Sequence, residues 1–285
     1  MKYFLLAVRF LFLLFVFMLL SFAIARLGGY PFGHHIKFGV YLFYGFLVTY
    51  WLKHAALRHK ALWWAAFLLP NVAFAVWYFY TIHFQFFQLA VPSTLAFFMG
   101  LAAGWVVDKR TFYPVLVFLA LLSWWVYKDG YAYWLNKLNQ GTYTGKLNNA
   151  ERKKLDIFLT DSKGHPVDLS GPDVYYVLDF WSSSCGECFR EFPVYEKFYH
   201  EIKDNPRIRF YAVNVPRHPM DDLKEYENLV KDYTFPVVFY SVDRKTLLEK
   251  TDINAFPTLL VVKNDTVIFR GRSHTFMKFY RRYLK

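Results

Sequence analysis

The sequence has few cysteines, and its most apolar half has almost no acidic residues. Two cysteines in 285 residues exclude a small fold held together by several disulfides. A hydrophobic content of 55%, with 22% aromatic residues, excludes a disordered chain. Residues 1–149 contain only two acidic residues, Asp108 and Asp129, against 12 Lys and Arg. Their net charge is therefore +10, whereas residues 150–285 carry +2.

The excess positive charge lies in the apolar half, and this placement indicates its role. A strongly basic chain can indicate nucleic-acid binding. Here the basic residues flank apolar runs, as the positive-inside rule for membrane proteins describes. We therefore predict contact with membrane lipid and no binding to nucleic acid.

Five apolar runs predict an all-α helical membrane domain over residues 1–134. A spanning helix needs about 20 mostly apolar residues, and somewhat fewer suffice when flanking Lys and Arg reach the interface. No charged residue lies deep inside a run, apart from Arg9 near one end, which argues against an ion pump. The predicted transmembrane helices are residues 4–26, 37–53, 61–81, 84–107 and 111–128.

Basic residues gather in alternate loops and predict the orientation of these helices. The loops after the second and fourth runs are basic, whereas the turn at 81–83 has no Lys or Arg. The N-terminus is then inside, and the C-terminal half lies outside the cytoplasm, on the periplasmic side of a multi-pass inner-membrane protein. A cleaved signal peptide ending at Ala23-Ile24-Ala25 is the alternative for the first run and leaves the C-terminal half outside. The basic loop residues are Lys53, Arg58, Lys60, Lys109 and Arg110.

Residues 135–153 are rich in Asn and Gly and predict a polar linker. Beyond them, residues 154–285 alternate between short apolar strands and amphipathic helices. This alternation predicts a three-layer α/β/α domain around a buried sheet. The predicted strands are 155–160, 167–169, 174–180, 208–215, 237–240, 258–262 and 266–270, and the predicted helices are 186–202, 221–233 and 274–284.

Both cysteines lie where a buried strand is predicted to meet a helix. In Cys185-Gly186-Glu187-Cys188, one helical turn brings the two sulfurs within bonding distance. A redox dithiol, half of a zinc site with His200, and a static disulfide all fit this spacing. We favour the dithiol, because a helix N-terminus stabilises a thiolate on the first cysteine. We expect no metal and no cofactor beyond the redox-active cysteine pair.

Residues 155–284 resemble the thioredoxin superfamily, and within it the membrane-anchored TlpA/ResA-like thiol–disulfide oxidoreductases. The resemblance depends on three segments. Asp179-Phe180-Trp181 precedes the first cysteine, Glu191-Phe192-Pro193 follows the second, and Phe256-Pro257-Thr258 stands ahead of the last predicted hairpin. It implies a thioredoxin-like domain over residues 154–285.

The resemblance also implies a role for each site residue. Cys185 would be the attacking nucleophile and Cys188 the resolving thiol, while Asp179 would accept and return the proton of the resolving thiol. Pro257 would be cis and would hold the backbone of Phe256 against the disulfide, where a substrate backbone can pair. The residues expected around the cysteine pair are Trp181, Ser184, Gly186, Glu187, Glu191, Pro193 and Thr258.

Two positions depart from the family pattern. Ser184 replaces the Trp usually found before the first cysteine, and Glu187 replaces a proline common between the cysteines. A negative charge near Cys185 disfavours its thiolate. A less stable thiolate makes the cysteine pair more reducing. We therefore predict a reductase rather than an oxidase.

The prediction for the whole chain is a membrane-tethered, extracytoplasmic thiol–disulfide oxidoreductase. Its substrates would be exported proteins or apocytochromes that carry disulfides. No cysteine precedes Cys185, so electrons must come from a separate thiol donor protein. The alternative is a membrane binding, assembly or transport module that carries a redox-sensing thioredoxin-like appendage.

Overall fold

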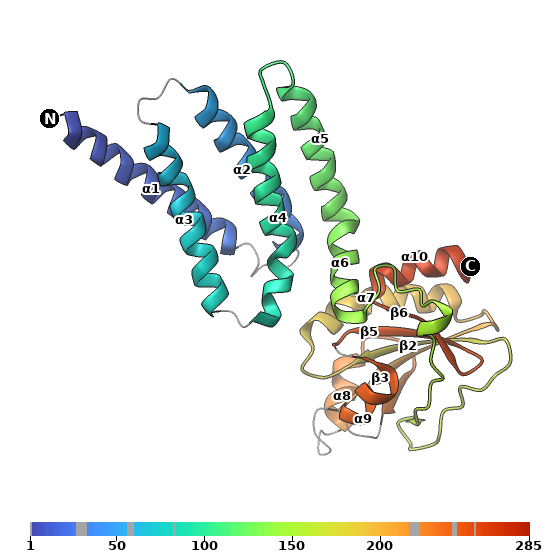
Figure 1. Ribbon diagram of the computed structural model, residues 1–285. Helices are drawn as coiled ribbons and strands as arrows, with labels where there is room; N and C mark the ends of the chain where they lie inside the picture. The colour runs from blue at the N-terminus through green and yellow to red at the C-terminus, as the bar shows by residue number, and fades with distance from the viewer. Residues whose placement is uncertain are drawn as a thin grey trace. The chain divides into compact units, whose positions relative to one another are not determined.

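The chain forms two compact units, Met1–Tyr131 and Ala132–Lys285, in a computed structural model (Figure 1). The structure describes residues 2–26, 33–55, 60–81, 84–216, 223–240, 244–253 and 255–285.

The first unit is helical. Within the described residues its helices are α1 (Lys2–Arg26), α2 (Gly33–His54), α3 (Lys60–Thr81), α4 (Phe84–Val106) and α5 (Phe112–Trp125), followed by the π-helical turn η2 (Val126–Gly130). The helical character predicted for the N-terminal half is therefore confirmed.

The five predicted membrane spans have less support. Among the described residues, one helix, α1, is long and apolar enough to cross a membrane, over Ala7–Ile24. In α4 the apolar stretch is shorter, Val91–Val106. Helix α5 has only 14 residues, and α2 includes Lys37 and Lys53 near its two ends. The other helices do not meet both conditions over the residues that the structure describes.

Helices α2 and α4 pack closely because of glycine. A Cβ atom on Gly100 would lie 2.2 Å from the carbonyl oxygen of Leu42, and one on Gly104 would lie 2.5 Å from that of Phe46. No larger residue fits at either position without moving the backbone. Small residues spaced by four allow such an approach between helices.

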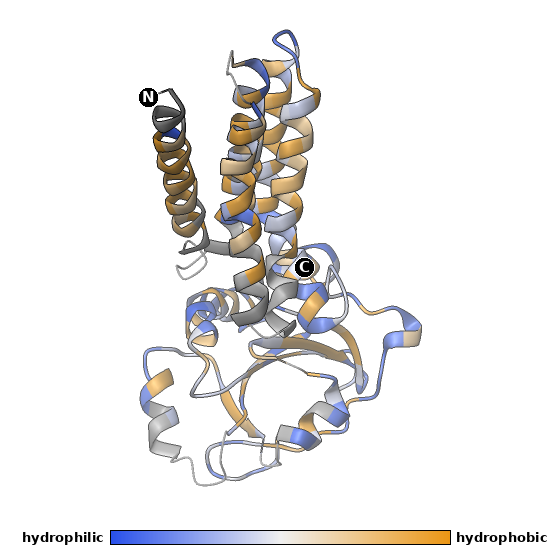
Figure 2. Ribbon diagram, turned by 60° about the vertical axis from the view of Figure 1, so that its left-hand side comes forward, coloured by the Kyte–Doolittle hydropathy of each residue, from blue (hydrophilic) through white to orange (hydrophobic). Residues whose placement is uncertain are grey.

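The outer surface of the first unit is apolar. The hydropathy colouring of Figure 2 shows the helices of this unit mainly in orange. Large apolar side chains that expose more than half of their surface include Phe12, Phe15, Leu69, Phe98, Trp105, Phe118 and Leu121. Soluble monomers rarely expose contiguous apolar patches of this kind.

The second unit is built on a mixed six-stranded sheet in the order β1-β4-β3-β2-β5-β6. Strands β2, β3 and β4 are parallel, whereas β1, β5 and β6 run antiparallel to their neighbours. The strands are β1 (Leu159–Thr160), β2 (Tyr175–Trp181), β3 (Ile208–Asn214), β4 (Val237–Tyr240), β5 (Thr258–Lys263) and β6 (Thr266–Gly271).

Helices cover both faces of this sheet. One face packs against α7 (Gly186–Ile202) and α10 (Ser273–Tyr283), with Tyr226 of α8 (Leu223–Val230) in the same core. The other face packs against Leu247 of α9 (Arg244–Thr251). Central strand β2 contributes to both cores, because its side chains alternate between the two faces. The predicted thioredoxin-like α/β architecture is therefore confirmed for this unit.

Three elements differ from the predictions. The strand expected at 155–160 is reduced to the two residues of β1, because the backbone N–H of Leu155 bonds to Asp265 instead. Residues 167–169 form no strand. A single bridge joins Thr160 to the preceding residue, Pro166, and the backbone N–H of Val167 bonds to Leu159. Helix α9 was not predicted, since its sequence is mostly polar. The start of the helix expected at 221–233 lies outside the described residues.

The predicted linker belongs to the second unit instead. Helix α6 (Tyr131–Gln140) follows η2 directly, and residues 145–147 pair with β6. Gly145 adopts φ +85°, and a Cβ atom there would collide with the Phe269 ring. The Asn and Gln residues of this segment suggested solvent exposure, but Asn136 and Gln140 of α6 are buried and hydrogen-bonded. Residues 135–147, expected to form part of a polar linker, thus lie in the second unit as the end of α6 and a segment paired with β6.

Candidate active site

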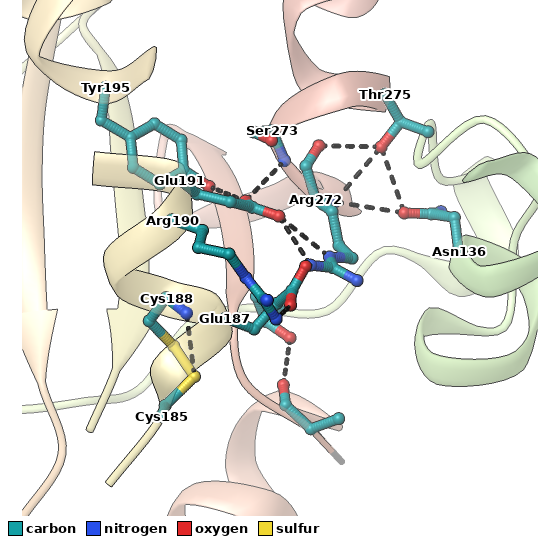
Figure 3. A network of polar contacts seen from close by, with 12 residues as sticks. Asn136, Cys185, Glu187, Cys188, Arg190, Glu191, Tyr195, Arg272, Ser273 and Thr275 are labelled. Atoms are coloured by element: carbon teal, nitrogen blue, oxygen red, sulfur yellow. Dashed lines mark hydrogen bonds and ion pairs between the residues drawn. A yellow bond between two sulfur atoms is a disulfide. The ribbon is translucent and has the colours of Figure 1, made fainter. Parts of the chain in front are cut away.

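The cysteine pair lies at the start of α7. Cys185 and Cys188 are joined by a disulfide, with 5.3 Å between their Cα atoms (Figure 3). Cys185 is the N-cap of α7, and its Sγ accepts a hydrogen bond of 3.2 Å from the backbone N–H of Cys188. Cys185 is partly exposed, whereas Cys188 is fully buried. The first sulfur is therefore the more accessible, at the positive end of a helix dipole.

A buried carboxyl group lies in the strand that precedes the pair. Asp179 of β2 is fully buried, in register with Ala212 and Leu259. Like Val177 and Trp181, it points toward the core that contains Cys188, since alternate residues of a strand share a face. Among the described residues, neither carboxyl oxygen of Asp179 has a hydrogen-bond partner. Burial, and secondly the charge of Glu191, raise the pKa of Asp179 well above its usual range.

Glu191 is the second buried carboxyl group, and unlike Asp179 it has hydrogen-bond donors on both oxygens. The Arg272 guanidinium donates two hydrogen bonds to Oε1, at 2.7 and 3.1 Å. The Tyr195 hydroxyl donates to Oε2 at 2.8 Å, and the backbone N–H of Ser273 donates at 3.2 Å. Both carboxyl oxygens of Glu191 are therefore held by hydrogen-bond donors, in contrast to those of Asp179.

Glu187, between the cysteines, is paired with two arginines. Its Oε1 accepts a 2.9 Å hydrogen bond from Arg272, and its Oε2 accepts one from Arg190 (Figure 3). Burial raises the pKa of Glu187, but the two arginines outweigh burial and hold the pKa below its usual range. The sequence argument treated Glu187 as a lone negative charge. The structure shows that Arg272 shares its charge between Glu187 and Glu191.

The segment around Pro257 approaches the same core. The Phe256–Pro257 peptide bond is cis. Phe256 and Cys185 both pack against the core cluster that contains Cys188. Thr258, the next residue, is fully buried and pairs with Phe180 in the sheet. Its hydroxyl donates to the Ala255 carbonyl at 2.5 Å.

The remaining predicted residues divide into two groups. Trp181 is fully buried and makes edge-to-face contacts with Phe189 and Phe192, at 6.0 and 5.3 Å between ring centroids. Ser184, Gly186 and Pro193 are exposed. No contact of these three shows a function, and a Cβ atom on Gly186 would meet nothing.

His200 does not join the cysteine pair. Its ring nitrogen contacts Glu196 at 3.0 Å, and it lies 12 residues beyond Cys188 on α7. At 1.5 Å per residue, that is about 18 Å along the helix. The half-zinc interpretation of the cysteines therefore has no support in the structure.

Sequence reasoning missed four residues of this network. Glu187, Glu191 and Tyr195 are spaced by four on α7, so a helical projection could have found Tyr195. Arg272 is 81 residues from Glu191 along the chain, and no local pattern marks it. Asn136 and Gln140 were assigned to a linker.

Comparison with known proteins agrees with this geometry. Residues 173–268 match a family model described as thioredoxin-like. The C-terminal domain is thioredoxin-like. This match, together with the two relatives described next, confirms the resemblance to the TlpA/ResA-like oxidoreductases.

Two curated relatives are named thiol-disulfide oxidoreductase ResA. The protein from Geobacillus kaustophilus is 34% identical over 118 residues, which cover 39% of this chain and 63% of the relative. The protein from Bacillus subtilis is 30% identical over 126 residues, covering 42% and 65%. The chain thus spans less than two thirds of the length of these relatives. A solved thiol:disulfide interchange protein from a Bacteroides species is 23% identical, with a TM-score of 0.39, covering 45% of this chain and 84% of that one.

Proposed function

We propose that this protein is a thiol–disulfide oxidoreductase that reduces disulfide bonds of other proteins. The observation that carries the proposal is the Cys185–Cys188 disulfide at the N-terminus of α7, with the first sulfur the more accessible and the second buried. Cysteine pairs in this setting exchange electrons with substrate through mixed disulfides.

The dithiol form of the pair is the reductant. The Cys185 thiolate attacks one sulfur of a substrate disulfide, and the other substrate sulfur leaves as a thiolate and takes up a proton. Cys188 then attacks the Cys185 sulfur, and the second substrate thiol leaves. Two electrons pass to the substrate, and the pair becomes the disulfide seen in the structure.

Asp179 is proposed as the proton carrier for Cys188. Its raised pKa brings the carboxyl group toward the working pH, as general acid–base catalysis requires. It accepts the Cys188 proton when the pair is oxidised and returns it when the pair is reduced again. Glu191 is not suited to this task, because its two oxygens are already held by Arg272, Tyr195 and Ser273.

The reductase direction is favoured by the charge around the pair. Glu187 and Glu191 share one buried cation, Arg272, while Arg190 is largely exposed and its charge is screened. The local charge near the sulfurs is therefore negative, which disfavours a thiolate. A disfavoured thiolate stabilises the disulfide and lowers the reduction potential.

The helices of the first unit are proposed as five membrane spans, with the thioredoxin-like domain outside the cytoplasm. The apolar outer surface of this unit and the alternation of basic loops support the arrangement. Substrates would then be exported proteins or apocytochromes. Because residues 1–184 contain no cysteine, a separate thiol protein must supply the electrons.

Redox titration of the full chain in detergent tests the proposal. The fraction of reduced pair is read by maleimide labelling after equilibration in dithiothreitol or glutathione buffers. We expect a reversible two-electron transition below about −200 mV. A value between about −120 and −180 mV would make the protein an oxidase or isomerase. The absence of any transition would contradict the proposed function.

A further inference from the structure

Helix α6 provides a buried amide side chain to the network around the disulfide. Asn136 is fully buried, and its Oδ1 accepts hydrogen bonds of 3.1 Å from the backbone N–H of Arg272 and from the Thr275 hydroxyl (Figure 3). Its Nδ2 donates to the Thr142 carbonyl at 2.8 Å. Asn136 therefore fixes the backbone of Arg272 at the start of α10.

Arg272 carries this constraint to the cysteine pair. Its guanidinium bonds to both Glu187 and Glu191. Glu187 lies between the cysteines, and Glu191 lies one turn beyond it on α7. A chain of hydrogen bonds thus leads from α6, through Arg272, to the segment that holds the disulfide.

A second amide of α6 reaches the loop of the cis-proline. Gln140 exposes 2% of its surface, and its Nε2 donates a 2.6 Å hydrogen bond to the hydroxyl of Thr258, the residue after Pro257. The Gln140 backbone carbonyl accepts from the Arg270 side chain at 3.2 Å. One turn of α6 therefore contacts both segments that border the site.

These contacts are more than a tether requires. A polar tether would keep its amides in water, because burying an amide without hydrogen bonds is costly. Asn136 bonds through both its amide oxygen and its amide nitrogen, whereas Gln140 bonds through Nε2 and its Oε1 has no partner among the described residues. Removing either amide would break these buried hydrogen bonds, although the Arg272 backbone N–H keeps a bond to the Thr275 hydroxyl and the Thr258 hydroxyl keeps its bond to the Ala255 carbonyl. The buried hydrogen bonds of α6 thus hold in place two segments next to the disulfide.

We propose that Asn136 and Gln140 are positioning residues of the redox site, and that α6 is part of the oxidoreductase domain. The inference rests on the proposed function. Asn136 acts through Arg272 on the charge balance around Cys185. Gln140 acts through Thr258 on the cis-proline segment, where an extended substrate backbone can pair. The two residues should therefore affect different properties.

The test for Asn136 uses the full chain in lipid nanodiscs. We compare Asn136→Ala with Asn139→Ala, which lies on the same helix and takes no part in this network. In Asn136→Ala, Arg272 is displaced and offsets the negative charge of Glu187 less well, so the Cys185 thiolate becomes less stable. Cys185 of the reduced protein should therefore react with iodoacetamide about threefold more slowly at neutral pH, which corresponds to a rise of half a unit in its pKa. Asn139→Ala should react like the wild type.

A double variant shows whether Asn136 acts through Arg272. Arg272→Ala should slow alkylation at least as much as Asn136→Ala, and combining the two should add nothing further. A general loss of structure would instead give additive effects. Additivity would overturn the assigned route.

The test for Gln140 uses turnover of a synthetic peptide with one internal disulfide. Gln140→Ala should raise KM about threefold or more, with the reduction potential and kcat unchanged. Because the two amides bond to different loops, each variant decides the proposal if the other does not fold. If the wild type shows no redox transition, the proposed function fails. If the wild type titrates and both variants match it, α6 is only a tether and the inference is overturned.

Discussion

The two units of the chain differ in where they place charged groups and apolar side chains. The first unit leaves large apolar side chains exposed and uses charge at helix ends. Lys53, for example, donates to the carbonyls of Trp105 and Val107 at the end of α4. The second unit covers most of its apolar side chains and buries carboxyl groups next to a disulfide.

The difference teaches where each unit obtains its stability and its chemistry. Exposed apolar helices are stable when lipid replaces water around them. Buried carboxyl groups do not stabilise a fold by themselves, and they are retained where shifted ionisation is useful. This contrast supports the proposal that the first unit is a membrane anchor and the second unit is the reactive part. Changes that remove charge from one unit, or add it to the other, test this contrast.

The largest expected effect is the loss of the accessible sulfur. Cys185→Ser should abolish turnover, because the remaining thiol, Cys188, is fully buried and cannot reach a substrate disulfide. The control is Cys188→Ser, which retains the nucleophile and should trap a mixed disulfide with substrate on a non-reducing gel. Trapping by Cys185→Ser instead would reverse the assigned roles.

Replacing Asp179 should give the next largest effect. In Asp179→Asn, the second exchange step should slow by about 10²-fold, since general acid–base catalysis contributes roughly 10²–10⁴-fold. Stopped-flow measurement after mixing reduced protein with substrate separates the two steps. The wild-type rate of this step should rise with pH as Asp179 ionises, whereas the variant should lack that rise. An unchanged rate would exclude Asp179 as the proton carrier.

The same variant should also change how the stability of the protein depends on pH. The pKa of Asp179 is raised in the folded state, chiefly by burial, so the folded protein binds the proton more tightly than the unfolded chain. The wild type therefore loses stability as pH rises from the unfolded-state pKa through the raised folded-state pKa. Asp179→Asn should melt at a temperature a few degrees higher at neutral pH and equal to the wild type at low pH. An advantage confined to low pH would contradict this assignment.

Charge introduced into the first unit should prevent insertion if lipid covers it. Leu121 of α5 is 63% exposed, and Leu121→Arg should cost about 3 kcal/mol at the centre of a bilayer. Carbonate extraction of membranes should release more of this variant than of the wild type. The matched control is Phe158→Arg, at an apolar residue of the second unit that is 56% exposed. Equal extraction of both variants would show that Leu121 does not face lipid.

Much of the difference between the two units could be predicted from the sequence, and the features that could not be predicted have physical reasons. The central strands and α7 were predicted because buried strands are continuously apolar and because the helix repeats its apolar residues. The cysteine pair and Asp179 were identified through a local motif. Arg272 and α6 were not, because their roles come from hydrogen bonds between segments far apart in the chain. A buried Asn or Gln has the same composition signal as an exposed one.

The smallest expected effect concerns Glu187, whose charge the sequence argument considered alone. An unpaired charge between the cysteines could change the reduction potential by tens of millivolts, since about 30 mV corresponds to a tenfold change in the equilibrium constant. Arg272, which Glu187 shares with Glu191, and the exposed Arg190 offset part of this charge, so Glu187→Gln should raise the potential by only about 10 mV. Glu196→Gln, on the same helix but bonded to Thr234, is the control and should leave the potential unchanged. A rise beyond about 30 mV would mean that the arginines do not offset this charge, and that Glu187 itself sets the reducing character of the pair.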